Sequence, residues 1–249
     1  MTFAGKIISC VVLGLTGLLG GGTLFAFMLF LYVGPFELVS LGLGESAALW
    51  LNACLCLAFF LQHSLMIRRS FRKTVARFLP REYDAAFFSI ASGIVLLVML
   101  VFWQESTYRL GEVQGTGGLL LRGVYFLSLA GFVWGMGALG VFDPFGLIPI
   151  LDHLRGKKRP PVPLVVRGPY RWVRHPLYLF LILMFWSYPD LTADRLLFNV
   201  LWTVWMIIGT VLEERDLVAS FGDAYRDYQA EVPMMIPYRF SRSHRDGRE

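Results

Sequence analysis

Long apolar runs separated by short polar segments dominate the pattern of hydrophobic and polar positions along this chain of 249 residues. About 20 apolar residues in a helix are enough to cross a bilayer. The runs predict helices at residues 7–33, 47–66, 86–103, 118–142, 177–189 and 196–212. The fifth run is short, and Tyr188-Pro189-Asp190 ends it just before the sixth begins. We therefore expect an all-α, polytopic membrane helix bundle of about six transmembrane helices with a C-terminal helical hairpin.

The composition agrees with a membrane protein. Hydrophobic residues make up 56% of the chain and charged residues only 16%, whereas soluble domains carry about 25% charged residues. The length suits one integral membrane domain over residues 1–238, followed by a polar tail at 239–249. The first apolar run is too long for a signal peptide, so we expect a retained helix. The three cysteines have neither metal-ligand nor redox spacing, so we expect no metal site.

The basic residues predict the orientation in the membrane. Twenty of the 23 Lys and Arg residues lie before the first run, after the second, between the fourth and fifth, or after the sixth. The loops on the other side hold only Arg109, Arg122 and Arg195. By the positive-inside rule, both termini and both long basic loops are cytoplasmic. Because these cations lie beside apolar runs, they favour contact with anionic membrane lipid and argue against nucleic acid.

Two glycine pairs have the spacing of close helix contacts. Gly17 and Gly21 lie four residues apart in the first run, and Gly131 and Gly135 have the same spacing in the fourth. Small residues at this spacing let helix backbones approach each other. We interpret both pairs as packing positions.

A basic and aromatic segment, Arg167 to Tyr178, enters the fifth run. Pro176 suits the first turn of a helix, which leaves Arg174 and His175 at the helix entrance beside unpaired backbone N–H groups. Such an entrance favours an anion, and Tyr170 and Tyr178 flank it. Charge beside a membrane segment is costly and usually functional. We interpret the segment as a ligand site; the alternative is a positive-inside loop with aromatic residues at the headgroups.

An acidic pair, Glu213 and Glu214, follows the sixth run. Because the C-terminal end of a helix disfavours negative charge, we expect a compensating partner. Arg171, Arg174 or a bound cation would serve, and an ion pair with Arg215 is the alternative.

A short helix is expected after Gly222, with Tyr225 and Tyr228 on one face. It ends at the proline-containing segment Val232-Pro-Met-Met-Ile-Pro237, which also stops any longer helix. The same short helix would serve equally as an amphipathic element lying on the membrane.

Together these motifs resemble a known family. R-H-P-x-Y at 174–178, the acidic pair, F-G-x-x-Y-x-x-Y at 221–228 and V-P-x-x-I-P at 232–237 are similar to the isoprenylcysteine carboxyl methyltransferase superfamily. The resemblance covers residues 167–237. Upstream, Gln62-His63-Ser64 and the segment 141–146 resemble the bacterial methanethiol S-methyltransferase and NnrU-like branch, and Pro233-Met-Met is closer to that branch.

The resemblance implies a membrane methyltransferase that uses S-adenosylmethionine and methylates a small or lipophilic thiol, with its active site on the cytoplasmic side of a bacterial inner membrane. It implies catalytic roles for Arg174, His175, Glu214 and His63. The implied cofactor-binding residues are Tyr170, Arg174, His175, Pro176, Tyr178, Glu213, Glu214, Tyr225 and Tyr228. A cationic cluster would lower the pKa of the thiol, which attacks as thiolate. Phe180 replaces the glycine common in relatives, and we expect its ring to narrow the acceptor route.

Other functions remain open at this stage. A haem-binding membrane protein of the NnrU or carotene-isomerase kind would use His63 as an axial ligand. An isoprenylcysteine carboxylate or a lipid amine would serve a methyltransferase as acceptor in place of a thiol. A membrane scaffold or transporter subunit is the third class, but it gives the acidic pair beside a basic helix entrance no purpose.

Overall fold

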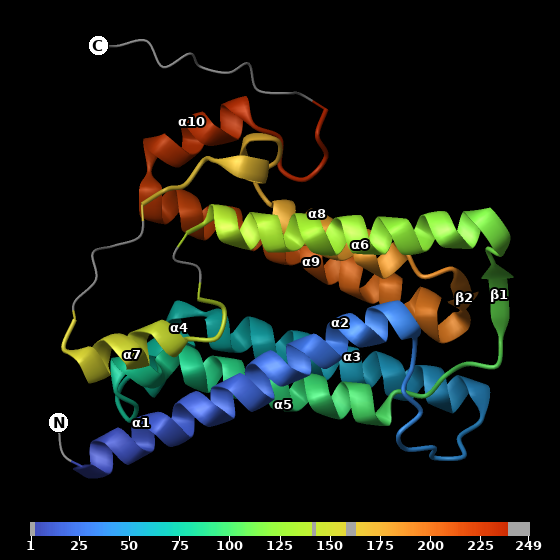
Figure 1. Ribbon diagram of the computed structural model, residues 1–249, viewed down its shortest axis with the longest axis horizontal. Coiled ribbons are helices and arrows are strands. Elements are labelled where there is room, and N and C mark those ends of the chain that lie inside the picture. Colours follow the sequence, from blue (N-terminus) through green and yellow to red (C-terminus); the bar gives the residue numbers. More distant parts are fainter. Residues whose placement is uncertain (1–2, 141–142, 158–162, 239–249) are drawn as a thin grey trace. The chain divides into compact units, whose positions relative to one another are not determined.

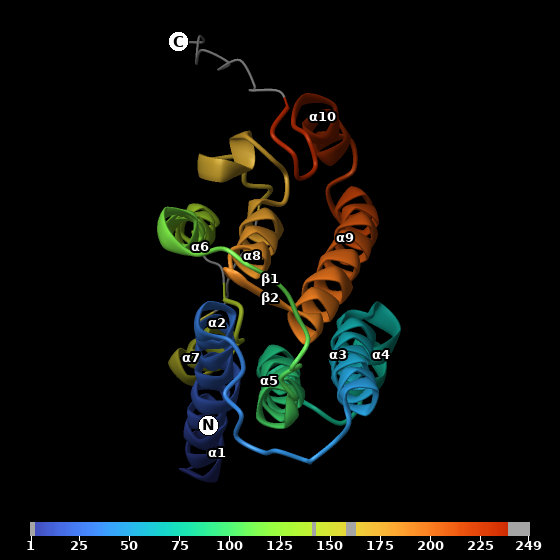
Figure 2. The same ribbon diagram turned by 90° about the vertical axis from the view of Figure 1, so that its right-hand side faces the viewer.

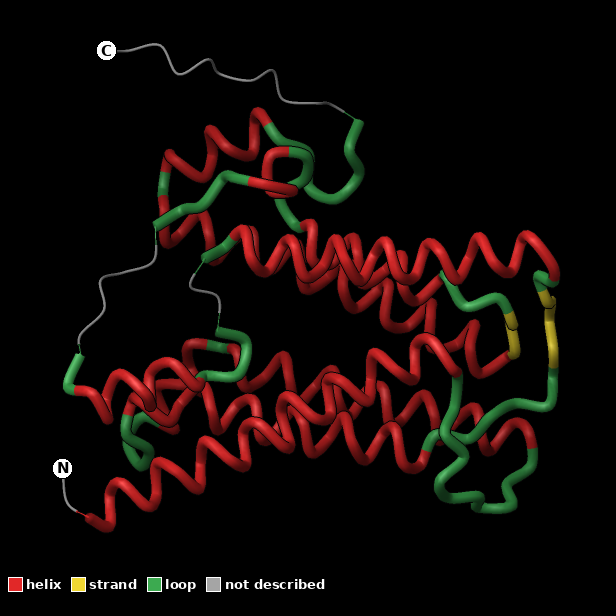
Figure 3. The backbone as a smooth tube through the Cα atoms, viewed as in Figure 1, coloured by secondary structure: helices red, strands yellow, loops and turns green. Residues whose placement is uncertain are grey.

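The computed structural model describes residues 3–140, 143–157 and 163–238 (Figure 1). Helices account for most of these residues, and the strands among them are the short β1 (Arg109–Glu112) and β2 (Asp190–Thr192) (Figure 3). The α-helices are α1 (Phe3–Leu15), α2 (Thr23–Val33), α3 (Glu45–Ile67), α4 (Arg69–Val75), α5 (Asp84–Phe102), α6 (Gly115–Ala138), α7 (Leu147–Arg155), α8 (Pro176–Trp186), α9 (Ala193–Phe221) and α10 (Asp223–Glu231).

Five helical segments in the described part of the chain are long and apolar enough to cross a membrane. They are Phe3–Val33, Glu45–Ile67, Arg81–Phe102, Gly115–Ala138 and Ala193–Phe221. The predicted all-α, polytopic membrane fold is therefore confirmed. The eleven residues of α8 reach only about 16 Å along a helix axis, about half of a bilayer core. This agrees with the short fifth run of the sequence.

The α9 helix is longer at its C-terminal end than the apolar run predicts. The run ends at residue 212, but the helix continues through the acidic pair to Phe221. The expected position of Glu213 and Glu214 at a helix end was therefore wrong. Hydrophobicity ends at the membrane boundary, whereas a helix continues through good helix formers such as Glu, Arg and Leu. It ends where Gly222 adopts a positive φ of 60°.

The chain forms two compact units, each built from three segments. The first contains residues 1–119, 143–161 and 188–202, and the second contains 120–142, 162–187 and 203–249. Both α6 and α9 run from one unit into the other. The expectation of one domain over 1–238 stays a prediction. The tail at 239–249 and residues 158–162 of the second basic loop lie outside the described residues.

In the first unit, α5 lies between the α1–α2 helix and α3 (Figure 2). A π-helical turn at Thr16–Gly22 joins α1 to α2. Opposite this turn, a Cβ on Gly93 of α5 would lie 1.9 Å from the carbonyl oxygen of Leu19, and a Cβ on Gly20 would lie 2.2 Å from Ser89 Oγ. The two backbones therefore approach closely here. A Cβ on Gly17 would meet nothing within 4 Å, whereas a Cβ on Gly21 would lie 3.9 Å from the ring of Phe145. The expected packing role was therefore wrong for Gly17.

Aromatic side chains fill the rest of this core. Phe30, Trp103 and Phe198 are buried, and their ring centroids lie 5.6–5.7 Å apart. The indole N–H of Trp103 donates to the Asp194 carboxylate at 2.8 Å, which satisfies the polar atom of an otherwise apolar ring. Nearby, β1 pairs with β2 in antiparallel register, with Arg109 opposite Thr192. These contacts fix the N-terminal part of α9.

In the second unit, α8 packs on two glycines of α6. A Cβ on Gly131 would lie 2.5 Å from the ring of Phe180, and a Cβ on Gly135 would lie 2.7 Å from Leu177. The predicted packing role of Gly131 and Gly135 is confirmed. On its other side, Trp186 donates to Thr203 of α9 at 3.0 Å. The short α8 and the C-terminal part of α9 form the predicted hairpin.

The close approach of α5 to the π-helical turn gives a stability prediction. Gly93→Ala places a methyl group against the Leu19 carbonyl, so we expect a loss of about 1–3 kcal/mol or more from overpacking and a lower melting temperature in detergent. Gly14→Ala is the matched control, because a Cβ there meets nothing within 4 Å. Equal melting temperatures for the two variants would show that the two backbones are not in contact.

Candidate functional site

The R-H-P-x-Y segment reaches α8 through a tight turn. Residues Gly168–Arg171 form a 3₁₀ turn, and Gly168 adopts a φ of 57° where a Cβ would lie 3.0 Å from that of Ala138. Pro176 is the first residue of α8 and His175 precedes it as the N-cap. The predicted position of Pro176 in a first helical turn is thereby confirmed.

The backbone N–H groups of Arg174 and His175, just before α8, are bonded to the C-terminal segment. Arg174 N donates to the carbonyl of Pro233 at 2.9 Å, and His175 N donates to that of Met234 at 3.0 Å. The expectation that the first turn of α8 offers unpaired N–H groups to an anion beside Arg174 and His175 stays a prediction. The C-terminal segment that follows α10 docks on Arg174 and His175. Because a buried N–H must find an acceptor, this segment fixes the entrance of α8.

The side chain of Arg174 pairs with Glu214. Its Nε lies 2.6 Å from Glu214 Oε1 and its Nη2 lies 2.9 Å from Oε2, which is the two-pronged geometry that makes such pairs strong. The side chains are 9% and 13% exposed. Arg174 Nη1 also donates to the carbonyls of Gln229, at 3.0 Å, and Val232. Burial acts to lower the pKa of Arg174, but the hydrogen bonds and charge of Glu214 outweigh it and raise that pKa.

Three further donors complete the environment of Glu214. His175 Nε2 lies 3.1 Å from it, Gln229 Nε2 2.8 Å and the Tyr225 hydroxyl 3.2 Å. With the two contacts of Arg174, these groups use all of the roughly four acceptor sites of a carboxylate. Glu214 is thus fully engaged within the protein.

Its neighbour Glu213 is in a different position. The side chain is 43% exposed and accepts one hydrogen bond from the Tyr178 hydroxyl, at 2.7 Å. His175 Nδ1 is 3.7 Å away, and the His175 ring stacks parallel to that of Tyr178 at 5.7 Å. Glu213 therefore keeps acceptor capacity for a ligand.

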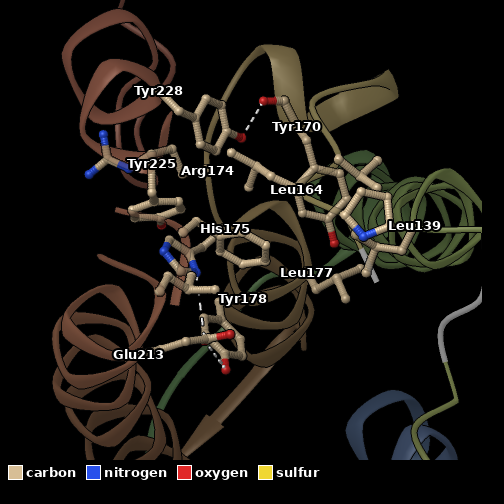
Figure 4. A pocket seen from close by; sticks show the side chains of 14 residues that line it. Leu139, Leu164, Tyr170, Arg174, His175, Leu177, Tyr178, Glu213, Tyr225 and Tyr228 are labelled. Carbon is tan, nitrogen blue, oxygen red and sulfur yellow. Dashed lines mark hydrogen bonds and ion pairs between the residues drawn. The ribbon is translucent and has the colours of Figure 1, made fainter. Parts of the chain in front are cut away.

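Glu213 and the tyrosines surround a cavity of about 320 Å³ in the second unit (Figure 4), a volume within the range of small-molecule sites. The described residues that line it are Leu139, Pro163, Leu164, Val165, Tyr170, Arg174, His175, Leu177, Tyr178, Glu213, Leu217, Phe221, Tyr225 and Tyr228. Glu214 is not part of this lining but bonds to three residues of it, and Pro176 begins α8 between His175 and Leu177. Seven of the predicted site residues therefore share one cavity.

The tyrosines from α10 close one side of the cavity. Tyr225 and Tyr228 are buried and pack against Leu164, and the Tyr228 hydroxyl donates to the carbonyl of Tyr170 at 2.6 Å. Burial raises the pKa of Tyr170, Tyr225 and Tyr228 well above the usual value for a phenol. Negative charge raises these pKa values further: the charge of Glu213 acts on Tyr170, and the charge of Glu214 acts on Tyr225 and Tyr228. All three phenols are neutral at physiological pH. Tyr225 and Tyr228 already donate to Glu214 and to the Tyr170 carbonyl, so Tyr170 is the one of the three that can donate to a ligand.

Two residues singled out in the sequence lie elsewhere. His63 belongs to the first unit, where its ring lies 4.8 Å from that of Phe88 and its Nδ1 lies 3.4 Å from Ser92 Oγ. Its catalytic role stays a prediction. Phe180 rests on Gly131 and is not among the described residues that line the cavity.

The apolar half of the cavity was missed by sequence reasoning. Leu139 follows the end of α6, and Leu177 is the second residue of α8. In an apolar chain such leucines carry no local signal of function. The proline-rich segment after α10 did carry a signal, but its partners on Arg174 and His175 are distant in sequence.

The fold and the cavity define a polytopic helical membrane protein with a cavity of polar and apolar side chains at the start of the short helix α8. The chain is 35% identical to a methanethiol S-methyltransferase of Pseudomonas deceptionensis, over 82% of this chain and 79% of that protein. It is 32% identical to the methanethiol S-methyltransferase of Mycobacterium tuberculosis, over 77% of this chain and 79% of that protein. The chain is also 26% identical to Nurim of Rattus norvegicus, over 69% of this chain and 68% of that protein.

These similarities show that the chain belongs to the family of the methanethiol S-methyltransferases, and that it is a membrane methyltransferase that uses a methyl donor. The resemblance to the isoprenylcysteine carboxyl methyltransferase superfamily is thereby confirmed. No family model and no solved structure matches the chain.

The saturated environment of Glu214 gives a second prediction. Glu214→Gln removes the charge opposite the buried Arg174, so we expect a loss of about 3 kcal/mol and a lower melting temperature, with turnover falling as α10 loosens. Glu213→Gln is the control on the adjacent residue and should melt near the wild-type temperature, because Glu213 is half exposed. A Glu214→Gln variant that melts like wild type would assign Glu214 a direct role in binding instead.

Proposed function

We propose that the protein transfers a methyl group from S-adenosylmethionine to a small thiol in the cavity of the second unit. One observation carries this proposal. Glu213 can still accept hydrogen bonds, and it lines the same cavity as neutral tyrosines and apolar side chains. The relatives named methanethiol S-methyltransferase support a thiol as acceptor.

The polar half of the cavity fits the donor. S-adenosylmethionine carries an amine and ribose hydroxyls, which need acceptors, and a carboxylate and a sulfonium. Glu213 would accept hydrogen bonds from the amine or hydroxyls, and Tyr178 holds its carboxylate in place from the side. The phenols of Tyr225 and Tyr228 already donate their protons within the protein, so their oxygens can only accept from the donor. Their aromatic faces attract a sulfonium as they do other cations.

Arg174 and Glu214 act indirectly in this scheme. Arg174 is occupied by Glu214 and by the carbonyls of Gln229 and Val232, so its charge is offset within the protein. We infer that this pair positions α10, and through it Tyr225 and Tyr228, rather than lowering the pKa of the acceptor thiol. The nucleophile is then a thiolate that has lost its proton to water before it binds.

When bound, the donor supplies an activated methyl group. The residues of the chain position the two reactants in line and exclude water from the acceptor side, and positioning of this kind contributes much of the acceleration of a displacement. The electron pair of the thiolate forms the new C–S bond, and the pair of the broken bond remains on the donor sulfur.

We further propose that the cavity opens on the cytoplasmic side of a bacterial inner membrane. The basic loops support this orientation, because the positive-inside rule places them in the cytoplasm and the R-H-P-x-Y segment is the end of one of them. A soluble donor would enter from water, and a small apolar thiol would arrive through lipid or from the cytoplasm.

Glu213 provides the direct test. In isothermal titration calorimetry on purified protein, we expect S-adenosylhomocysteine to bind and Glu213→Gln to weaken it by about tenfold or more. Loss of one hydrogen bond to a charged group costs roughly 1.5–3 kcal/mol. The matched control is Glu231→Gln, the same change at an exposed residue at the end of α10. Absence of heat with folded wild-type protein would contradict the proposed donor, and equal affinities in both variants would remove Glu213 from the site.

A further inference from the structure

The two sides of the cavity differ in how many polar groups they offer. Glu213, His175, Arg174 and Tyr225 gather on one side. His175, Arg174 and Tyr225 each bond to Glu214, and Glu213 accepts from Tyr178. Leu139 and Leu177 lie on the other side together with Tyr170, whose hydroxyl points toward these leucines (Figure 4). A ligand with several polar groups fits the first side, and a ligand with a single polar atom fits the second.

The Tyr170 hydroxyl is the polar group of the second side. Its backbone carbonyl accepts from Tyr228, which fixes the residue, but among the described residues no hydrogen-bond partner reaches its phenolic oxygen. The residue is only 9% exposed. Among the described residues, the Tyr170 hydroxyl is not one of the fully buried polar atoms that lack a partner, so it is reached from the cavity. A ligand that fills this side would need to bond to it, because a polar group buried without a partner is costly.

On this basis, which rests on the proposed function, we propose that Tyr170, Leu139 and Leu177 form the acceptor subsite. The Tyr170 hydroxyl donates a hydrogen bond to the acceptor sulfur, and the two leucines enclose its alkyl group. Tyr170 is thus reassigned from the donor site, where the family resemblance places it, to the thiol.

The chemistry of the phenol agrees with this role. Burial and the charge of Glu213 raise the pKa of Tyr170, so the phenol keeps its proton and acts as donor, not as base. A thiolate accepts that hydrogen bond while a lone pair remains for attack on the methyl carbon. The thiol proton has gone to water, the new C–S bond forms, and the broken bond leaves its electron pair on the donor sulfur, so atoms and charge balance.

The packing of α8 assigns the size limit to Leu177 and not to Phe180. Leu177 borders the cavity and its Cδ2 is held against Gly135 of α6. Phe180, one turn later, is held against Gly131. Both side chains pack on glycines of α6, but of the two only Leu177 is among the described residues that line the cavity. The phenyl ring that replaces the usual glycine therefore serves packing.

The first experiment measures kcat and KM for methanethiol and for S-adenosylmethionine, together with the S-adenosylhomocysteine Kd. For Tyr170→Phe we expect the thiol KM to rise about three- to tenfold, the range of one hydrogen bond, with the donor KM, the Kd and the melting temperature unchanged. Tyr108→Phe, at a residue that is 67% exposed, is the control.

The second experiment compares Leu177→Ala with Phe180→Ala on alkyl thiols of increasing length. We expect Leu177→Ala to raise the kcat/KM of butanethiol relative to methanethiol by about tenfold or more, the scale on which a pocket discriminates methylene groups. Phe180→Ala should lower the melting temperature and leave that ratio unchanged. The ratio is insensitive to partial loss of folded protein, so a stability loss in either variant does not obscure it.

Each result decides a separate point. A wild-type thiol KM in Tyr170→Phe, or a weakened Kd for S-adenosylhomocysteine, overturns the assignment of Tyr170 to the acceptor. A changed length profile in Phe180→Ala and not in Leu177→Ala overturns the size limit. Wild-type protein that methylates none of the thiols overturns the proposed function itself, and the acceptor subsite with it.

Discussion

The ion pair between Arg174 and Glu214 holds the second unit together around its cavity. Arg174 belongs to the entrance of α8, Glu214 to α9, and the remaining contacts of Arg174 are carbonyls at the end of α10. Three segments distant in sequence therefore meet at one guanidinium. Because the pair is largely buried, each charge depends on the other, and removing one leaves the other without compensation. The tyrosines that line the cavity are placed by this arrangement.

The two adjacent glutamates have different environments in this arrangement. Successive residues of a helix point about 100° apart, so Glu213 and Glu214 cannot face the same neighbours. Glu214 faces the guanidinium and α10, where five donors surround it. Glu213 faces the cavity and keeps one hydrogen bond, from Tyr178. An acidic pair in a membrane enzyme can thus contain one member that is engaged within the protein and one member that remains open to a cavity.

Glycine determines how closely helices approach in both units. In the first unit Gly93 admits the backbone of the π-helical turn, and in the second Gly131 and Gly135 admit the side chains of α8. Apolar side chains face lipid as readily as protein, so close packing and not hydrophobicity selects these contacts. The position of α8 against α6 in turn places Leu177 at the cavity. The contacts that pack α8 against α6 therefore also place a residue of the proposed acceptor subsite.

The sequence by itself determined the features that depend on local pattern. Apolar runs located the helices, Pro176 marked the start of α8, and the order of R-H-P-x-Y, Glu213-Glu214, Tyr225 and Tyr228 indicated one site. These inferences hold because helix length, proline geometry and helix periodicity act within a few residues. The length of α9 was misjudged because apolar character and helix propensity end at different positions.

Only the tertiary structure decided which of these residues meet. Pro233 and Met234 take the N–H groups of Arg174 and His175, a pairing across some sixty residues that no local pattern encodes. The π-helical turn at Thr16–Gly22 changes the helical period, so the four-residue spacing of Gly17 and Gly21 does not define one face. The apolar cavity wall is equally invisible in a chain rich in leucine. Long-range contacts follow from the packing of whole helices, and that packing is what the local pattern leaves open.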